Sequence, residues 1–156
     1  YCADALQERL RPPTGWLHGP VDWEHLDQYE LRTHDDARRF RTGTLNGVGI
    51  AALHAALGLH LEAGPAWCEE RVLDLSTTLA TALEERGLPR YGTDDPAHAS
   101  GIVTVAPDAP EALFECLEAH DITTAVRNRK VRFAPTYYND KSDLRRILNV
   151  IDAFRE

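Results

Sequence analysis

The hydrophobic residues follow a helical period between residues 45 and 86. Apolar positions recur at intervals of three and four, first over 45–63 and again over 65–86, which predicts two successive helices. Gly64 and Pro65 divide them, because glycine favours the end of a helix and proline its first turn. The first stretch is rich in alanine and glycine as well as leucine. We therefore expect this helix to be buried on more than one side.

Shorter elements fill the chain after residue 100. Runs of β-branched and apolar residues at 101–106, 122–127 and 130–134 predict strands, the last two joined by a tight turn. Helical patterns at 110–120 and from residue 140 onward predict two further helices. In the second of these, Asp140 and Asp143 are spaced as a capping pair. The strand, helix and strand around 110–120 fit either a crossover or an antiparallel meander, and the sequence leaves both open.

Together these elements predict an α+β fold. Three strands with helices packed on one face form a two-layer domain, built on a small, mainly antiparallel three-stranded sheet. The long helix that begins near residue 45 precedes this domain. Residues 15–36 hold no sustained period, so they predict an extended N-terminal arm. Because so long a loop is unusual in an isolated domain, we expect the arm to lie on a partner surface.

Charge and composition narrow the range of partners. The chain has 25 acidic and 17 basic residues and a net charge of −8, which argues against nucleic acid, since proteins that bind it present a basic face. No apolar run is long enough to span a bilayer. Three cysteines without metal-like spacing predict a reduced, cytoplasmic protein. The chain lacks methionine and starts at Tyr1, which we interpret as a piece of a longer or processed polypeptide.

A Gly-Thr pair stands just before the first long helix, in the basic segment 39–46 (Arg-Phe-Arg-Thr-Gly-Thr-Leu-Asn). Glycine lets backbone N–H groups approach an anion, threonine adds a hydroxyl donor, and a helix N-terminus adds further donors. Gly43 and Thr44 therefore have the chemistry of a phosphate-binding corner. The alternative, which the spacing alone favours, is an ordinary helix cap preceded by a turn glycine.

Two segments of the chain resemble class V aminotransferase-type enzymes, the pyridoxal-phosphate enzymes that include cysteine desulfurases, kynureninases and amino-acid epimerases. One is segment 39–46 with the helix after it, and the other is segment 127–139 (Arg-Asn-Arg-Lys-Val-Arg-Phe-Ala-Pro-Thr-Tyr-Tyr-Asn). The likeness runs from roughly residue 15 to the end and corresponds to the C-terminal part of such an enzyme. It implies that residues 1–44 form an arm and a cofactor-phosphate loop, and that residues 45–156 form the small domain.

This resemblance implies roles for individual residues. In such enzymes the Gly-Thr loop reaches the phosphate of the cofactor held by the other subunit of a homodimer, so Gly43 and Thr44 would bind pyridoxal 5′-phosphate. Trp16 would be a further contact to that phosphate. Arg132 would bind the α-carboxylate of an amino-acid substrate, a task that suits the paired N–H donors of a guanidinium group. The alternative for Arg132 is a surface residue paired with a neighbouring strand.

The departures from the family pattern point to a missing part. The lysine that attaches the cofactor has no counterpart, since Lys130 and Lys141 stand at other positions. The resemblance therefore implies that a large N-terminal domain, or a separate lysine-bearing chain, completes the site, and that this chain alone is inactive. Desulfurases carry a nucleophilic cysteine shortly before the substrate arginine, whereas residues 122–131 contain none. Desulfurase activity is accordingly disfavoured.

Two kinds of function remain in competition. The first is the C-terminal domain of a pyridoxal-phosphate enzyme that acts on an amino acid, of the transaminase, lyase or epimerase type. The second is a self-contained, non-catalytic α+β module that binds a partner or a small anion. The absence of methionine and the arm without a partner favour the first. An enzyme split over two polypeptides is a third possibility.

Overall fold

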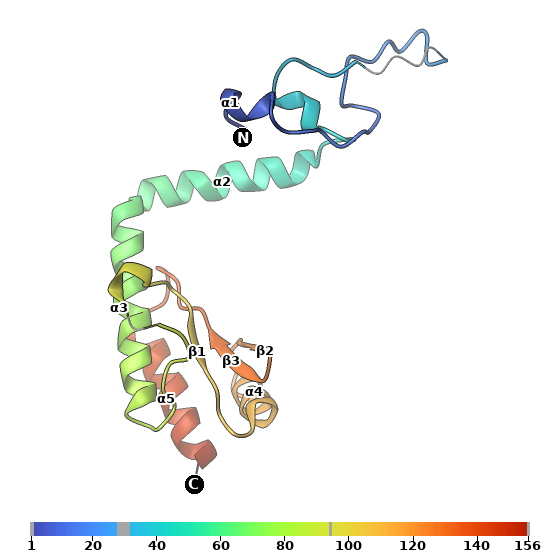
Figure 1. Ribbon diagram of the computed structural model, residues 1–156. Helices are drawn as coiled ribbons and strands as arrows, with labels where there is room; N and C mark the ends of the chain where they lie inside the picture. The colour runs from blue at the N-terminus through green and yellow to red at the C-terminus, as the bar shows by residue number, and fades with distance from the viewer. Residues whose placement is uncertain (1, 28–31, 94, 156) are drawn as a thin grey trace. The chain divides into compact units, whose positions relative to one another are not determined.

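The computed structural model describes residues 2–27, 32–93 and 95–155 of the chain. Contacts divide the chain into two compact units, Tyr1–Ala55 and Ala56–Glu156, and Figure 1 labels the elements of both. No helix in the described ranges is long and apolar enough to cross a membrane.

The first unit consists mainly of irregular loops. Its short helices are α1 (Asp4–Gln7) and the 3-10 turn η1 (Ala37–Phe40). The Arg39 guanidinium ties these parts together, because it donates to the Gln7 carbonyl oxygen at 3.4 Å and to the Thr33 hydroxyl at 3.1 Å. The predicted arm thus has the irregular backbone that its lack of a period indicated, although its residues 28–31 lie outside the described residues.

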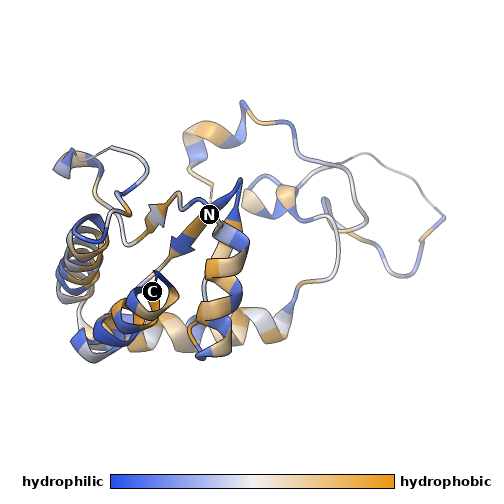
Figure 2. Cartoon of the chain, turned by 90° about the horizontal axis from the view of Figure 1, so that it is seen from below, coloured by the Kyte–Doolittle hydropathy of each residue, from blue (hydrophilic) through white to orange (hydrophobic). Residues whose placement is uncertain are grey.

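Helix α2 (Gly47–Ala63) corresponds to the first predicted helix. The expected burial on several sides is wrong for the described chain, in which no α2 residue is buried. The sequence of α2 places apolar residues on every side of the helix, whereas α5 has one polar and one apolar side. Figure 2 colours the chain by hydropathy. A helix that is apolar all round requires cover from other protein. Its large apolar side chains are all more than half exposed: Val48, Ile50, Leu53, Leu57, Leu59 and Leu61.

The second unit contains the predicted α+β domain. Its helices are α3 (Pro65–Glu84), η2 (Pro96–His98), α4 (Pro110–Ala119) and α5 (Lys141–Arg155). The hydrophobic stripe of α3 faces the core, where Leu75, Leu79 and Leu83 have no exposed surface. The predicted helices are confirmed, with slightly shorter ends. Residues from α4, α5 and the strands complete the same core, among them Leu113, Leu117, Val131, Phe133, Leu144 and Ile151.

Three short strands form one antiparallel sheet in the order β1-β3-β2. They are β1 (Val103–Val105), β2 (Ala125–Arg127) and β3 (Lys130–Phe133). Because β3 pairs antiparallel with both neighbours, β1 and β2 run parallel to each other on either side of it. Helix α4 therefore connects them as a crossover. The antiparallel meander, which the sequence had left open, does not occur.

The two faces of the sheet have different surroundings. Val131 and Phe133 of β3 are buried against the helices. Lys130 and Arg132 alternate with them along the strand and are half-buried, so their side chains belong to the other face. The predicted two-layer arrangement, with helices on one face, is thus confirmed. It leaves Arg132 at the centre of the face that the core does not use.

Candidate functional site

The Gly-Thr pair lies in an exposed loop that ends at α2. Asn46 caps this helix, since its Oδ1 atom accepts a hydrogen bond from the Gly49 amide at 2.9 Å. The ordinary cap that the spacing favoured is therefore present, and it falls on Asn46. Within residues 2–27, 32–93 and 95–155, the amides of Gly43 and Thr44 make no hydrogen bond. These loop amides, more than the helix end, are the donors available to an anion.

Trp16 lies against this loop although it is distant in the sequence. A Cβ atom built on Gly43 would be 3.2 Å from the Trp16 Nε1 atom. A Cβ atom built on Gly15 would collide with the backbone carbonyl of Thr42, so this glycine is what lets the two loops touch. Trp23 supports the Trp16 ring edge-on, with centroids 5.7 Å apart. The first unit therefore brings the predicted residues Trp16, Gly43 and Thr44 to one place.

The polar groups around this place are suited to an anion. The Thr44 hydroxyl is exposed, and the indole N–H of Trp16 points toward the loop beside Gly43. The Nε atom of Arg41 is buried and has no hydrogen-bond partner in the described structure, which is a costly state unless an acceptor is supplied. Amides, an indole, a hydroxyl and a guanidinium are all donors. Such a donor set fits the phosphate of pyridoxal phosphate.

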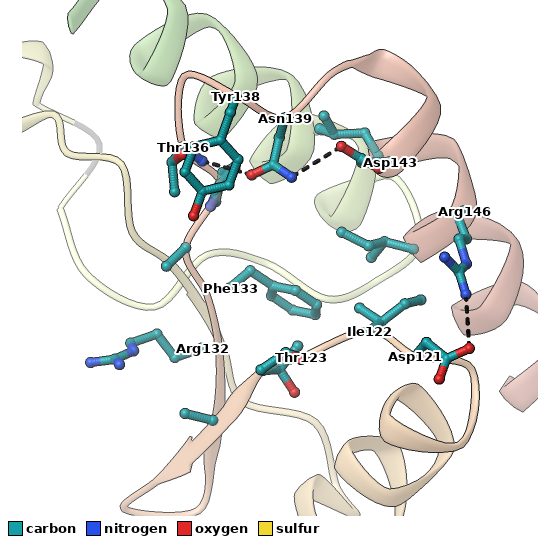
Figure 3. A pocket seen from close by; sticks show the side chains of 16 residues that line it. Asp121, Ile122, Thr123, Arg132, Phe133, Thr136, Tyr138, Asn139, Asp143 and Arg146 are labelled. Atoms are coloured by element: carbon teal, nitrogen blue, oxygen red, sulfur yellow. Dashed lines mark hydrogen bonds and ion pairs between the residues drawn. The ribbon is translucent and has the colours of Figure 1, made fainter. Parts of the chain in front are cut away.

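Arg132 lies in the second unit, on the central strand. Its cross-strand neighbours are Thr104 and Ala125, a register that also agrees with the alternative of a residue paired with a neighbouring strand. Figure 3 shows its side chain on the side of β3 opposite to that of Phe133. Its Nε atom is buried and has no partner among the described residues. Guanidinium N–H groups pair well with carboxylate oxygens, so this donor could bind such a ligand.

A cavity of about 450 Å³ is lined by residues of segments 121–125 and 132–136 and of α5, and Arg132 stands at its edge. Two of its threonines, Thr124 and Thr136, have buried hydroxyl oxygens without a hydrogen-bond partner in the described part of the chain. Unpartnered polar atoms in a cavity favour a polar occupant or water. Thr124 belongs to no motif, and Thr136 lies within the motif 127–139 without a predicted role, so only the fold brings these threonines together.

Asn139, the last residue of the motif 127–139, has a structural task. Its Oδ1 atom accepts from the Thr136 amide at 3.0 Å, and its Nδ2 atom donates to the Asp143 carboxylate at 3.0 Å. Asp143 also accepts from the Asp140 amide at 3.0 Å, which confirms the predicted capping pair. Hydrogen bonds from the Ser142 side chain and amide lower the pKa of Asp140 below its ordinary value. This network fixes the turn that connects Arg132 to α5.

Neither lysine of the chain stands where the resembling enzymes carry their cofactor-binding lysine. Lys130 Nζ lies 4.3 Å from the centroid of the Tyr91 ring, in a cation–π contact. Lys141 is exposed at the first position of α5. The described residues also contain no group of three or more His, Cys, Asp or Glu side chains that could hold a metal ion.

The chain is similar to known proteins in both sequence and fold. No protein-family profile matches the chain. Over 117 residues it is 26% identical to YcbU, an uncharacterized aminotransferase of Bacillus subtilis (strain 168), and this match covers 75% of the chain. Over 98% of its length it superposes on the apo structure of a cysteine desulfurase from Thermococcus onnurineus NA1, with a TM-score of 0.81 and 22% identity.

The chain has the fold of part of a cysteine desulfurase. The resemblance to class V aminotransferase-type enzymes is thereby confirmed at the level of the fold. The matches span 31% of the length of YcbU and 41% of the desulfurase. This shared fold does not identify the reaction that the enzyme catalyses. In this chain a two-residue turn, Asn128–Arg129, joins β2 and β3 where the desulfurase pattern would place a cysteine.

Proposed function

We propose that this chain is the C-terminal small domain of a pyridoxal-phosphate-dependent enzyme that acts on an amino acid. In this proposal residues 1–44 supply the arm and the cofactor-phosphate loop, and residues 45–156 supply the substrate-binding domain. The transaminase, lyase and epimerase types all fit these residues. The cofactor, when bound, withdraws electrons from the α-carbon of the substrate. The residues of this chain bind and orient the two anionic groups.

The observation that carries the proposal is the meeting of Trp16 with the Gly43–Thr44 loop. These segments are distant in the sequence, and their contact depends on Gly15, since a Cβ atom at this position would collide with the Thr42 backbone. The two unbonded loop amides and the Thr44 hydroxyl would hold the phosphate of the cofactor, with the Trp16 indole as an additional donor. By the resemblance, that cofactor belongs to the other subunit of a homodimer.

Arg132 has the second task, to grip the α-carboxylate of the substrate. Its unpartnered Nε atom supports this role, because bidentate pairing uses Nε or the terminal nitrogens in parallel. The chain does not by itself provide the cofactor-binding lysine. We therefore propose that a large domain or a lysine-bearing chain covers the apolar surface of α2, and that the assembled enzyme is cytoplasmic.

The reading frame upstream of Tyr1 gives the first test. The proposal expects it to continue in frame through a strand that ends in Ser-Lys or His-Lys. A chain that is instead monomeric, well folded and indifferent to pyridoxal phosphate is the self-contained module. Co-purification with a second, lysine-bearing polypeptide identifies the split enzyme.

Thr44→Val tests the phosphate loop in the assembled enzyme. We expect it to weaken cofactor binding about tenfold, since it removes one charge-assisted hydrogen bond. The measurement is the cofactor absorbance that remains after dilution and gel filtration. Thr42→Val is the matched control, because Thr42 is also an exposed threonine of this loop. Equal retention by the Thr44 variant and the parent contradicts the assignment.

A further inference from the structure

The open face of the sheet carries a line of positive charge. Lys130 and Arg132 lie on this face because the residues between and after them, Val131 and Phe133, are buried in the core. Arg127 of β2 is the register partner of Lys130, and residues directly opposite each other in a sheet project to the same face. Three cationic side chains therefore share one face of a chain whose net charge is −8.

None of these cations is neutralised by an acid. In the described part of the chain, Arg127, Lys130 and Arg132 form no ion pair with a carboxylate. Arg127 donates to the carbonyl oxygen of its neighbour Val126 at 2.8 Å, and Lys130 donates to the Asn128 carbonyl at 3.2 Å. Like charges held together without a counter-ion repel one another, so an anion that joins them gains binding energy.

Lys130 contacts an aromatic ring. Its Nζ atom lies over Tyr91, and the Tyr91 amide donates to the Thr104 carbonyl of β1 at 2.7 Å. Thr104 is in turn the register partner of Arg132. The ammonium group is thus attached to the same three-strand frame that positions the Arg132 guanidinium. A preorganised cation loses less conformational entropy on binding than a freely moving one.

The spacing of the cations suits two anionic groups on one small molecule. Alternate residues of a strand are about 6.8 Å apart at their Cα atoms, and paired residues have Cβ atoms about 5 Å apart. Arg132 therefore stands one step along β3 from the pair formed by Lys130 and Arg127. When a ligand places one carboxylate at Arg132, a second anionic group a few bonds away on the same ligand can reach Lys130 and Arg127.

We propose that the amino acid bound by this domain carries a second carboxylate on its side chain. This inference rests on the proposed function: Arg132 takes the α-carboxylate, and Lys130 together with Arg127 takes the side-chain carboxylate. An amino acid with an apolar side chain would place that side chain against two unpaired cations. The cations would then lose hydrating water without gaining a charged partner. The open face of the sheet thereby selects acidic substrates.

The 156-residue chain itself provides the test, by chemical-shift titration with L-glutamate and with L-norvaline. These amino acids have the same number of carbon atoms, and only the first has a second carboxylate. We expect L-glutamate to bind about tenfold more tightly, the scale of one charge-assisted contact. Lys130→Gln combined with Arg127→Gln is expected to abolish this preference, because it weakens L-glutamate binding and removes the cations that disfavour the apolar side chain of L-norvaline. Arg145→Gln, an exposed position of α5, controls for the loss of a positive charge.

The outcomes separate this inference from the proposed function. Equal binding of both amino acids, with both dependent on Arg132, overturns the acidic preference alone. Absence of saturable L-glutamate binding, or a preference that survives the double variant, also overturns it. If O-phospho-L-serine binds more tightly than L-glutamate, the second anionic group of the ligand is a phosphate and the proposed side-chain carboxylate is wrong. The role of the Gly43–Thr44 loop is judged separately, by cofactor retention in the Thr44 variant.

Discussion

Arg132 has a buried guanidinium nitrogen without a hydrogen-bond partner in the described residues. The strand buries its neighbours and leaves its own Nε atom without an acceptor. In the assembled enzyme we expect Arg132→Lys to weaken amino-acid binding by about 1.5–3 kcal/mol, since lysine keeps the charge and loses the paired donors. Calorimetric titration with a non-reacting substrate analogue measures this change.

The control for this substitution is Arg145→Lys on α5, which changes the same chemistry at an exposed position. Its affinity should equal that of the parent. If Arg132→Lys also binds the analogue with unchanged affinity, then the α-carboxylate is held elsewhere.

Asn139 acts on stability and only indirectly on the site. Replacing it by alanine removes its bonds to the Thr136 amide and the Asp143 carboxylate. We expect Asn139→Ala to lower the free energy of unfolding by about 1–3 kcal/mol, the usual cost of losing bonds to a charged group and leaving an amide unpaired. Urea denaturation of the chain measures it. Asn149→Ala, at an exposed position of α5, should change little, and equal effects of the two substitutions would contradict the role given to Asn139.

At the scale of the element, the turn between β2 and β3 is strained. Asn128 and Arg129 have φ angles of 48° and 57°, the left-handed values that a two-residue turn with matching strand twist requires. Arginine tolerates this conformation less well than glycine does. We therefore expect Arg129→Gly to raise the free energy of unfolding by about 0.5–1 kcal/mol.

Arg129→Ala separates this conformational effect from the loss of the arginine side chain. It keeps a Cβ atom and should not stabilise the chain. A stabilisation by alanine as large as that by glycine would assign the effect to charge. Thermal unfolding followed by circular dichroism compares the three proteins.

Local chemistry explains which elements could be predicted from the sequence. Pro65, Pro110 and Asp140 mark helix starts by rules that need no tertiary structure, and all three were predicted correctly. The crossover through α4 could not be predicted, because the central position of β3 depends on strand pairing over long separations. The burial predicted for α2 failed because an apolar pattern indicates which residues favour burial and does not say what covers them.

Some residues of the candidate site could also be predicted from the sequence, and others could not. Gly43, Thr44 and Arg132 were found through motifs, and their roles remain proposals. Trp16 beside Gly43 was suggested only by the family resemblance, since loop packing leaves no period in a sequence. Lys130 was noted only as a lysine that does not match the cofactor-attachment position, and its contact with the Tyr91 ring depends on tertiary structure.

At the scale of the whole molecule, helix α2 exposes large apolar side chains in the described structure. We expect the 156-residue chain to self-associate through it, because each leucine that leaves water contributes about 1.5–3 kcal/mol. Leu57→Lys should weaken this association more than tenfold. Sedimentation velocity over a range of concentrations measures it. Glu62→Lys, a polar position of the same helix, is the control. Association that is insensitive to Leu57→Lys would place the contact elsewhere.

The strand order has a consequence for synthesis on the ribosome. The central strand β3 is the last of the three to be made, and β1 and β2 each pair with β3 and not with each other. Until residue 133 has left the exit tunnel, the nascent chain holds two unpaired edges and the apolar inner surfaces of α3 and α4. Such intermediates attract chaperones. A translational pause before this point would therefore prolong the aggregation-prone state, and one after it would not.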